Sequence, residues 1–599
     1  MDAYGRRRHF DAANRVTTGL SPALSCAILC LALAAGAAVP NPTITGPIPA
    51  TVTPGDPSRD YPFLATDVDL AQYGYVEQEY FMQGTANQST TPAGATGTII
   101  STGKPYKTRL LVRRPISASA FNGTVILEWY NVTNGFDVEP DWFQSHNYML
   151  EHGYAWIGVS AQRVGVSYLQ TWSPTGRYAT LDVTAGGTIT DDSLSYDIYS
   201  QAGQAILNPS GVNILSGLTV QTLIADGESQ SASRLATYVN SVHPLNPIYG
   251  GVFLHSTINN PIRVDLGDVK VFKFLTETDV VQSGEAAIRR PDMPNFVTWE
   301  ISGTSHSDYW LFLNYKGVRT RDATPPADNP PCPLQIPRSR ILAYRAQDAA
   351  YDHMVQWMRN GTQPPAGPPM EVSAVTPSVV PVRDVFGNIL GGIRLPDFAV
   401  PIATDTGINT NPVPPIPGVL CNLYGQYIPF DQQMLRAFYP TAGTYLLDTV
   451  AASNADVTAG YLLDIDAAGA NTTAAESGIG GSNLRNLDLS GINLMGVSLP
   501  NESLVGDNLT GANLSNSTLQ GTNLKGANLN GANLTGANLI GAGLQSANLQ
   551  GANLSNANLA GSTLKGASLG AAMWSNTVCP DGTNSDADGN TCLGHLGKL

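Results

Sequence analysis

The sequence predicts an α/β domain, with a mostly parallel sheet flanked by helices, followed by an all-β repeat domain. Apolar strand-like runs alternate with helical patterns over roughly 250 residues, which is typical of a parallel α/β sheet. One of these runs leads through a tight glycine turn and a serine into a helical pattern. Near the C-terminus, leucine recurs at every fifth position. A chain of 599 residues is too long for one compact core, so two or more domains are expected.

The chain opens with a basic segment and an apolar run. Four arginines in the first 15 residues precede the apolar residues 20–38, and small residues allow cleavage before Val39. This pattern predicts a signal peptide over residues 1–38, with an uncleaved membrane anchor as the alternative. The Pro/Thr-rich residues 39–60 are expected to form an extended leader. We therefore expect a protein that is secreted, periplasmic or at the cell surface.

Four cysteines remain once the signal peptide is removed. An even number in an exported chain indicates two disulfides. Nearness favours Cys579–Cys592, and elimination leaves Cys332–Cys421. No CxxC pair or His/Cys cluster indicates zinc, and no cofactor is expected. Residues 584–589 resemble the start of a calcium loop, but an EF-hand requires Glu where His595 stands, which favours a polar turn inside the disulfide.

The charge balance limits the classes of partner. The chain has 47 acidic and 32 basic residues, a formal net charge of −15. Such an excess of negative charge argues against nucleic acid and anionic membrane surfaces as binding partners.

The α/β domain is organised around residues 218–240. An apolar run ends at Ala225, the turn Asp-Gly-Glu-Ser-Gln follows at 226–230, and a helical pattern begins at Ser231. This is the layout of a nucleophile elbow, in which a tight turn lifts the hydroxyl of Ser229 clear of the sheet. Ser231 replaces the usual second glycine and is still small. The alternative is an ordinary strand–helix connection in which Ser229 caps the helix.

Two strand-like runs after the elbow helix, at 269–275 and 296–301, lead into loops that carry an acid and a histidine. Of the eight histidines, three follow the acid, and among these His306 lies in a loop after a strand. The order Ser229, Asp279, His306 is that of α/β-hydrolase triads. Glu277 is the alternative acid, since both side chains would point the same way if the strand continued. Asp279 is favoured.

Acyl transfer also requires donors for an oxyanion. The first candidate is the backbone N–H of Gln230, directly after the serine. The second is expected from the loop after the strand 123–129, where Tyr130 and Asn131 are the candidates. Residues 164–216 form a long insert, rich in Tyr and Trp, whose length suits a lid over the substrate.

The chain resembles the bacterial alpha/beta hydrolase domain proteins, a serine-hydrolase family of uncharacterised type. The matching segments are 74–79, 122–124, 128–131, 226–231, 276–279, 303–306, 361–365 and 384–396. The resemblance extends over about residues 61–475, so the hydrolase domain is placed at 61–476. It implies a serine-hydrolase fold with the triad at the positions given above, and it does not supply a substrate.

A linker at 477–482 separates this domain from the repeats. From Leu484 to Leu569 a leucine occupies every fifth position, which gives 18 units. This period fits a square coil with leucines inside, and it resembles the pentapeptide-repeat family, whose fold is a right-handed quadrilateral β-helix. We place the β-helix at 483–574 and a cysteine-containing cap at 575–599. Its surface is neutral and rich in Asn, Ser and Thr, which suits a spacer or a module that binds a protein or a polysaccharide.

These patterns together predict an exported carboxylic ester hydrolase that acts on a small-molecule or lipid-like ester and carries a non-catalytic rod. Two alternatives stay open. One is a surface binding or scaffold protein whose hydrolase fold has lost activity, and the other is an amide hydrolase, because a serine triad serves both bonds.

Overall fold

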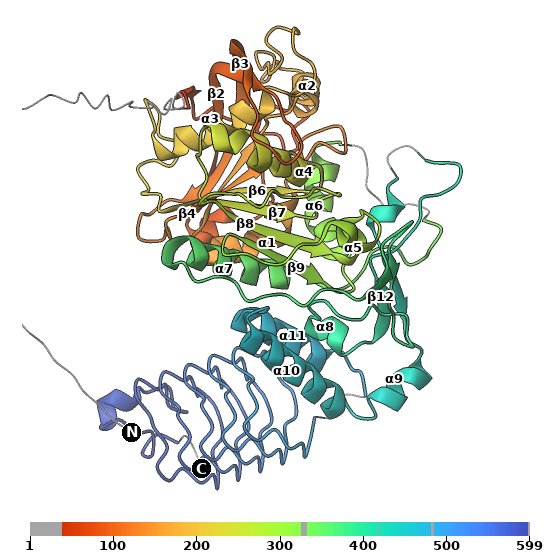
Figure 1. Cartoon of the computed structure of the whole chain (residues 1–599). Helices are drawn as coiled ribbons and strands as arrows, with labels where there is room; N and C mark the ends of the chain where they lie inside the picture. Colours follow the sequence, from red (N-terminus) through yellow and green to blue (C-terminus); the bar gives the residue numbers. More distant parts are fainter. Residues whose placement is uncertain (1–38, 325–331, 417–418, 481–483, 597–599) are drawn as a thin grey trace, which may run out of the picture. The chain divides into compact units, whose positions relative to one another are not determined.

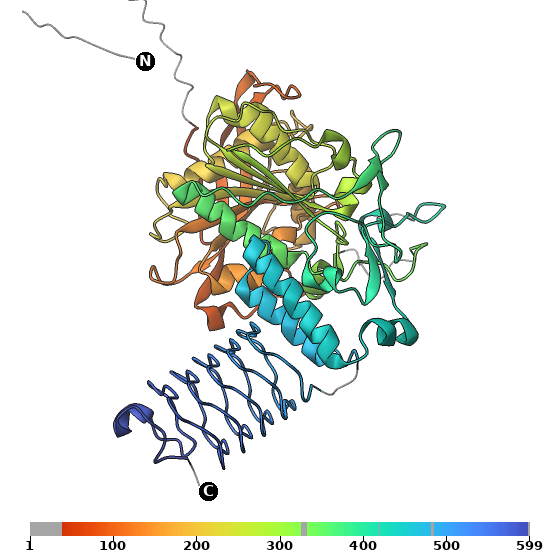
Figure 2. The same ribbon diagram turned by 60° about the horizontal axis from the view of Figure 1, so that its bottom comes forward.

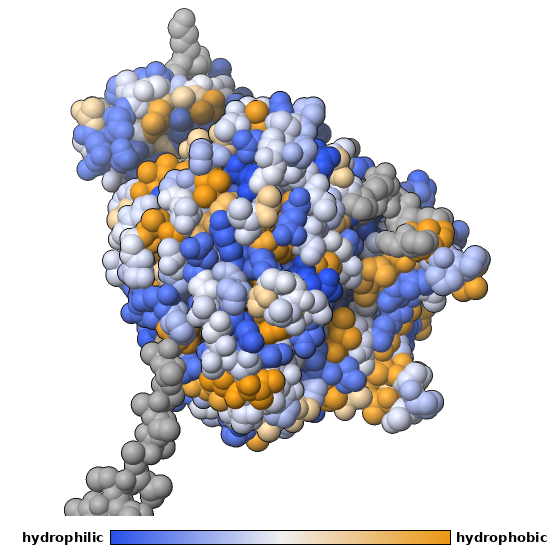
Figure 3. Space-filling model, turned by 90° about the horizontal axis from the view of Figure 1, so that it is seen from above, coloured by the Kyte–Doolittle hydropathy of each residue, from blue (hydrophilic) through white to orange (hydrophobic). Residues whose placement is uncertain are grey.

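The computed structural model describes residues 39–324, 332–416, 419–480 and 484–596. The predicted signal peptide at 1–38 lies outside these residues. Among the helices that the structure describes, none is both long and apolar enough to span a membrane. The molecular face in Figure 3 is a mosaic of small hydrophilic and hydrophobic patches.

Within the described residues a nine-stranded sheet forms the first core, with the order β1-β2-β3-β5-β4-β6-β7-β8-β9. Strands β4 to β9 are parallel, and β1, β2 and β3 join the other edge antiparallel. The strands are β1 (Thr43–Thr45), β2 (Tyr75–Ser89), β3 (Ile99–Pro115), β4 (Thr124–Trp129), β5 (Ala155–Val159), β6 (Thr222–Glu228), β7 (Gly251–His255), β8 (Lys270–Thr276) and β9 (Phe296–Ile301).

Two features of this sheet differ from the expectation. The expected leader supplies an edge strand, because Thr43–Thr45 pairs with the exposed edge of β2. Three strands follow the elbow helix rather than two. The additional one, β7, has only five residues, and its short apolar run directly follows a Gly-Gly pair at 250–251 that indicates a turn.

Helices cover both faces of the sheet (Figure 1). Helices α3 and α4 lie on one face, and α1 and α7 lie on the other. The helices of this part are α1 (Pro140–Glu151), α2 (Arg163–Trp172), α3 (Ser195–Leu207), α4 (Gln230–Thr237), α5 (Glu277–Val281), α6 (Tyr309–Arg321) and α7 (Tyr344–Asn360). This layering brings the carboxyl ends of β4, β6, β8 and β9 to one edge, where α/β sheets bind their ligands.

The following segment is irregular, as its Pro/Gly content predicts, with two small two-stranded sheets. Its elements are β10 (Val372–Ala374), β11 (Val380–Pro381), α8 (Pro396–Ala399), β12 (Ala403–Thr406), β13 (Gln426–Pro429) and α9 (Gln432–Phe438). The helices α10 (Ala442–Ala459) and α11 (Asp464–Glu476) then pair with each other.

The C-terminal repeats form the expected β-helix, whose coils are stacked in Figure 2. Parallel bridges join residues 20 positions apart, as in Asn508, Asn528 and Asn548, so four five-residue units complete one coil. The repeat leucines from Leu484 to Leu564 are buried along the axis, together with alanines that precede many of them, and Leu569 is half-buried. The first coil contacts α10 and α11, where the hydroxyl of Thr472 accepts the N–H of Ser498 at 3.0 Å.

Both predicted disulfides, Cys332–Cys421 and Cys579–Cys592, are formed. The second lies beside buried Trp574 at the end of the rod, with a short 3-10 helix at Ser585–Asp588. In the calcium-like loop, Asn584 caps this helix and the carboxylate of Asp586 accepts the N–H of Asn576 at 2.6 Å. These bonds are those of a polar turn.

Candidate active site

Ser229 occupies a sharp turn between β6 and α4. Its backbone has φ 58° and ψ −114°, a conformation that residues other than glycine rarely adopt. Gly227 allows the helix to approach, because a Cβ at this position would lie 3.0 Å from Ser231 and 3.1 Å from Leu235. The Ser231 hydroxyl closes the turn by donating to the carbonyl of Glu228 at 2.8 Å. The predicted strand, strained serine and helix are therefore present.

His306 lies in the loop between β9 and α6 and bridges the serine and an acid. Its Nε2 is 2.6 Å from the Oγ of Ser229, and its Nδ1 is 2.6 Å from the Oδ1 of Asp279. The backbone N–H of His306 donates to the hydroxyl of Thr278 at 3.1 Å, which fixes the loop. The structure thus brings Ser229, His306 and Asp279 together in one hydrogen-bonded row.

Glu277 is not part of this row. The strand ends at Thr276 and α5 starts at Glu277. Because two positions along a helix turn the side chain to a different side, Glu277 and Asp279 point apart, whereas in a strand they would point the same way. Glu277 pairs with Arg383 at 2.6 Å. Asp279 uses its second oxygen to accept the Thr276 N–H at 2.8 Å in a capping box, which leaves its first oxygen for His306.

Buried carboxylates control the protonation of the histidine. Burial alone would lower the pKa of His306, but the charges of Asp279 and Glu228 outweigh it and raise this pKa to about 9. For Asp279, burial acts to raise the pKa, and the opposing charge and hydrogen bond of His306 bring it below its usual value. The pair therefore favours an ionised acid beside a protonated histidine.

The three candidate donors to the oxyanion differ in whether their N–H groups already have partners. The backbone N–H of Gln230 is at the first position of α4, where a helix leaves its amide groups without an internal partner. The N–H of Tyr130 donates to Val159 at 3.3 Å, and that of Asn131 donates to Val138 at 3.0 Å. Tyr130 is buried away from the cavity, so its expected role is wrong. The Asn131 side chain does reach the site.

A cavity of about 680 Å³ opens beside Ser229 and His306. One wall comes from the loop after β4, which includes Asn131 and Thr133. The remaining wall is mainly apolar and aromatic and is formed by Leu311, Tyr315, Val419, Leu420, Leu423 and Tyr424. The volume and the apolar lining suit a small organic ligand with few polar groups.

The expected lid at 164–216 requires a correction. None of its residues lines this cavity. Its aromatic side chains are used in the core instead, where Tyr199 stacks on Trp129 with ring centroids 4.6 Å apart. The segment 419–424 lines the cavity in its place, and the disulfide Cys332–Cys421 anchors it. No periodic pattern marks this segment, because its position depends on a bond between residues 89 apart.

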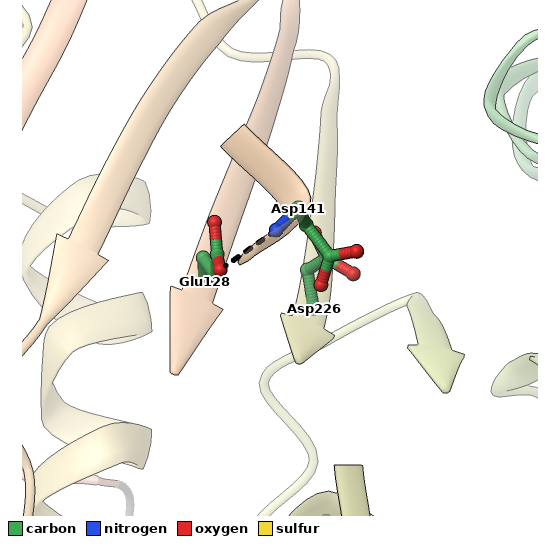
Figure 4. Close-up of side chains that lie close together, drawn as sticks. All are labelled: Glu128, Asp141 and Asp226. Carbon is green, nitrogen blue, oxygen red and sulfur yellow. Dashed lines mark hydrogen bonds between the residues drawn. The ribbon is translucent and has the colours of Figure 1, made fainter. Parts of the chain in front are cut away.

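Three buried carboxylates meet beneath the elbow: Glu128 on β4, Asp141 on α1 and Asp226 on β6 (Figure 4). Their oxygens lie within 4.8 Å of one another, a spacing that could hold a metal ion. Donors already surround them, since Trp156 donates to Glu128 at 2.8 Å and Tyr351 to Asp226 at 2.9 Å. Burial and the neighbouring Asp141 raise the pKa of Asp226 well above its usual value. Such a cluster can be held by protons and hydrogen bonds alone.

Comparison with family models decides the affiliation. The model described as "Alpha/beta hydrolase domain" matches residues 44–471 of the 599 residues. The chain belongs to this family. Membership identifies it as a hydrolase, in agreement with the elbow and the sheet order. A second model, for pentapeptide repeats, matches residues 508–545 and 537–572 of this hydrolase. No curated protein matches the chain.

Several solved structures similar to this hydrolase are pentapeptide repeat proteins. A pentapeptide repeat protein from the cyanobacterium Cyanothece 51142 is 43% identical, with 14% of this chain and 58% of that chain covered and a TM-score of 0.14. HetL, a pentapeptide repeat protein involved in heterocyst differentiation regulation from Nostoc, is 32% identical over 16% and 56%, with a TM-score of 0.13. A rice cell wall degrading esterase, LipA from Xanthomonas oryzae, is 11% identical over 31% and 43%, with a TM-score of 0.18.

Proposed function

We propose that this hydrolase is a serine esterase that uses Ser229, His306 and Asp279 as its catalytic triad. The observation that supports this proposal is the row of two 2.6 Å contacts that joins the serine, the histidine and the acid at the edge of the cavity. A serine is a weak nucleophile by itself and requires such a base, which in turn requires a carboxylate to fix its orientation.

In this mechanism the Oγ of Ser229 attacks the acyl carbon and its proton moves to Nε2 of His306. The carbonyl oxygen becomes an oxyanion, which the N–H of Gln230 is placed to stabilise, whereas the side-chain amide of Asn131 already donates to Glu228. His306 then returns the proton to the leaving alcohol, and the ester bond breaks. Water repeats the sequence on the acyl-enzyme and restores Ser229.

An ester with an apolar acyl or alcohol group fits the cavity best. Its outer wall is built mainly from Leu, Val and Tyr side chains, with Arg319 as a charged exception, and the apolar groups bind hydrocarbon by removing it from water. Amide hydrolysis is the second candidate, because the same triad can break both bonds. Comparison of matched ester and amide substrates with the same acyl group distinguishes the two activities.

The experiment that tests the triad is labelling of residues 39–599 with a fluorophosphonate probe. Ser229→Ala and His306→Ala should abolish the label, and Asp279→Asn should slow it by about 10³-fold or more. Glu277→Gln is the matched control, since it neutralises a buried carboxylate two positions away that pairs with Arg383 instead. It should label at nearly the wild-type rate.

An unlabelled wild type that also leaves short p-nitrophenyl esters intact would contradict the enzyme proposal. The same outcome would favour a binding or scaffold role for the chain. Loss of labelling in Glu277→Gln with normal labelling in Asp279→Asn would instead reassign the acid.

We further propose that the protein is exported and that the rod is a spacer or a module for a protein or polysaccharide. Two disulfides support export, because such bonds persist mainly outside the cytoplasm. Exposed positions of the coils carry mostly Asn, Ser, Thr and Gly, so the rod presents hydrogen-bonding groups and little charge. Mass spectrometry of the mature N-terminus tests cleavage before Val39.

A further inference from the structure

A second carboxylate faces the reacting side of the histidine. The Oε1 of Glu228, the last residue of β6, lies 3.1 Å from the Nε2 of His306. This is the same nitrogen that contacts Ser229, whereas Asp279 holds the opposite nitrogen. The imidazole is therefore placed between two carboxylates.

Glu228 is held firmly in this position. Its side chain is buried and lines the cavity, and Asn131 donates from Nδ2 to its Oε2 at 2.9 Å. The closed turn at Ser231 fixes its backbone. The carboxylate is thus oriented by two separate elements, the loop after β4 and the start of α4.

The charged groups around this pair come from several elements. Asp279 on α5 faces His306, and His255 on β7 and Asp141 on α1 lie near Glu228. His255 and Asp141 pair with each other at 2.6 Å, so they offset one another. Arg319 on α6 lines the same cavity. Asp279 and Glu228 are the charged groups that act directly on His306.

We propose that Glu228 is a positioning residue for His306, which it stabilises as an imidazolium while Ser229 attacks the substrate. The inference rests on the proposed function. As the bond between Oγ and the acyl carbon forms, the serine proton moves to Nε2 of His306. The resulting N–H faces Glu228 in addition to the reacting oxygens, so the new positive charge forms beside a negative one.

This arrangement sets the pH at which the enzyme works. His306 must be neutral to accept the proton, and its pKa is raised to about 9 by the carboxylates against the effect of burial. Burial raises the pKa of Glu228 to about 7, so Glu228 is ionised over the range in which His306 titrates. Activity should therefore increase with pH up to the alkaline range, and loss of the charge at position 228 should move that increase to lower pH.

The test is the pH dependence of fluorophosphonate labelling in the full mature chain, for wild type, Glu228→Gln and Glu228→Asp. An opposite charge at this distance shifts a pKa by about one unit or more, so the acid limb of Glu228→Gln should move down by about one pH unit. Relative to its own plateau, this variant should react up to about 10-fold faster below the limb. Glu228→Asp retains the charge and should keep the limb near the wild-type position.

A direct titration of His306 separates this inference from the proposed function. The downfield proton NMR signal of its Nδ1–H, assigned by its loss in His306→Ala, reports the imidazolium without any reaction. An equal midpoint in wild type and Glu228→Gln would overturn the role of Glu228. A lower midpoint in Glu228→Gln, in a chain that the probe never labels, would support the contact and contradict the esterase.

Discussion

Asp226 on β6 and Ser229 in the turn after this strand lie three residues apart, and each is held in an energetically costly local state. Ser229 is held at a positive φ, a cost of about 1–3 kcal/mol that the surrounding turn must offset. Asp226 is fully buried beside Asp141, where an ionised carboxylate would be expensive. The strained turn presents the Ser229 hydroxyl to the cavity. Protonation of Asp226 removes the cost of a buried charge in the carboxylate cluster.

At the residue scale, Asp226→Asn should leave the stability at neutral pH unchanged or raised. Because the folded protein holds the pKa of Asp226 well above 3.8, its favourable contribution is complete below pH 3.8 and declines as pH rises toward the raised value. Asn resembles the protonated acid and still accepts from Tyr351. Urea unfolding between pH 4 and 8 should show a flatter stability profile for this variant.

The matched control is Asp226→Ala, which leaves the buried Tyr351 hydroxyl without its acceptor. It should cost about 1–3 kcal/mol. A loss in Asp226→Asn equal to the loss in Asp226→Ala would show that the carboxylate is ionised in the fold and that its charge is needed.

At the scale of single elements, the end of one strand decides the acid. The strand β8 stops at Thr276 and α5 begins at once, which separates Glu277 from Asp279. The capping box that starts this short helix also holds Asp279 toward His306. Asp279 therefore lies in the site because α5 begins at this point of the chain.

The rod is the second element whose packing makes a prediction. Leu534 is fully buried between Leu514 and Leu554 of the neighbouring coils. Leu534→Ala should lower the free energy of unfolding by about 2–5 kcal/mol, because it leaves a cavity in the axial core. Thermal unfolding followed by circular dichroism measures the loss, and labelling of Ser229 in the folded protein should persist.

Lys525→Ala is the control on an exposed position of the same rod. Surface changes of this kind usually stay within about 0.5 kcal/mol. If Leu534→Ala were no more destabilising than Lys525→Ala, the leucine column would not be the core that supports the coils.

At the scale of the whole molecule, α10 and α11 connect two cores. Tyr445, Leu446 and Val450 of α10 belong to the apolar cluster of the rod. Leu462 and Ala467 belong to the cluster of the hydrolase sheet. The helix pair therefore caps the first coil while it contacts the catalytic part.

A chain shortened to residues 39–477 should consequently expose the apolar face of α10. We expect it to self-associate and to bind more of the dye ANS than the full mature chain. Light scattering coupled to size-exclusion chromatography gives the mass. A monomeric truncated chain with unchanged dye binding would show that the helix pair does not depend on the rod.

The sequence by itself determined the parts of this protein that depend on local periodicity and order along the chain. The five-residue leucine period predicts the β-helix without other information, since each unit repeats the same contact. Alternating strands and helices predict the sheet, and the order of Ser229, Asp279 and His306 names the residues that the structure brings together. The two disulfides followed from counting and nearness.

Only the tertiary structure decided which side chains meet across large separations. The choice of Asp279 over Glu277 required the point at which β8 ends, and the apolar wall at 419–424 required the disulfide that anchors it. The carboxylate of Glu228 is adjacent to Ser229 in sequence, yet its contact with His306 depends on a loop 78 positions later. Such contacts carry no periodic signal, because packing between elements, rather than the pattern within one element, sets them.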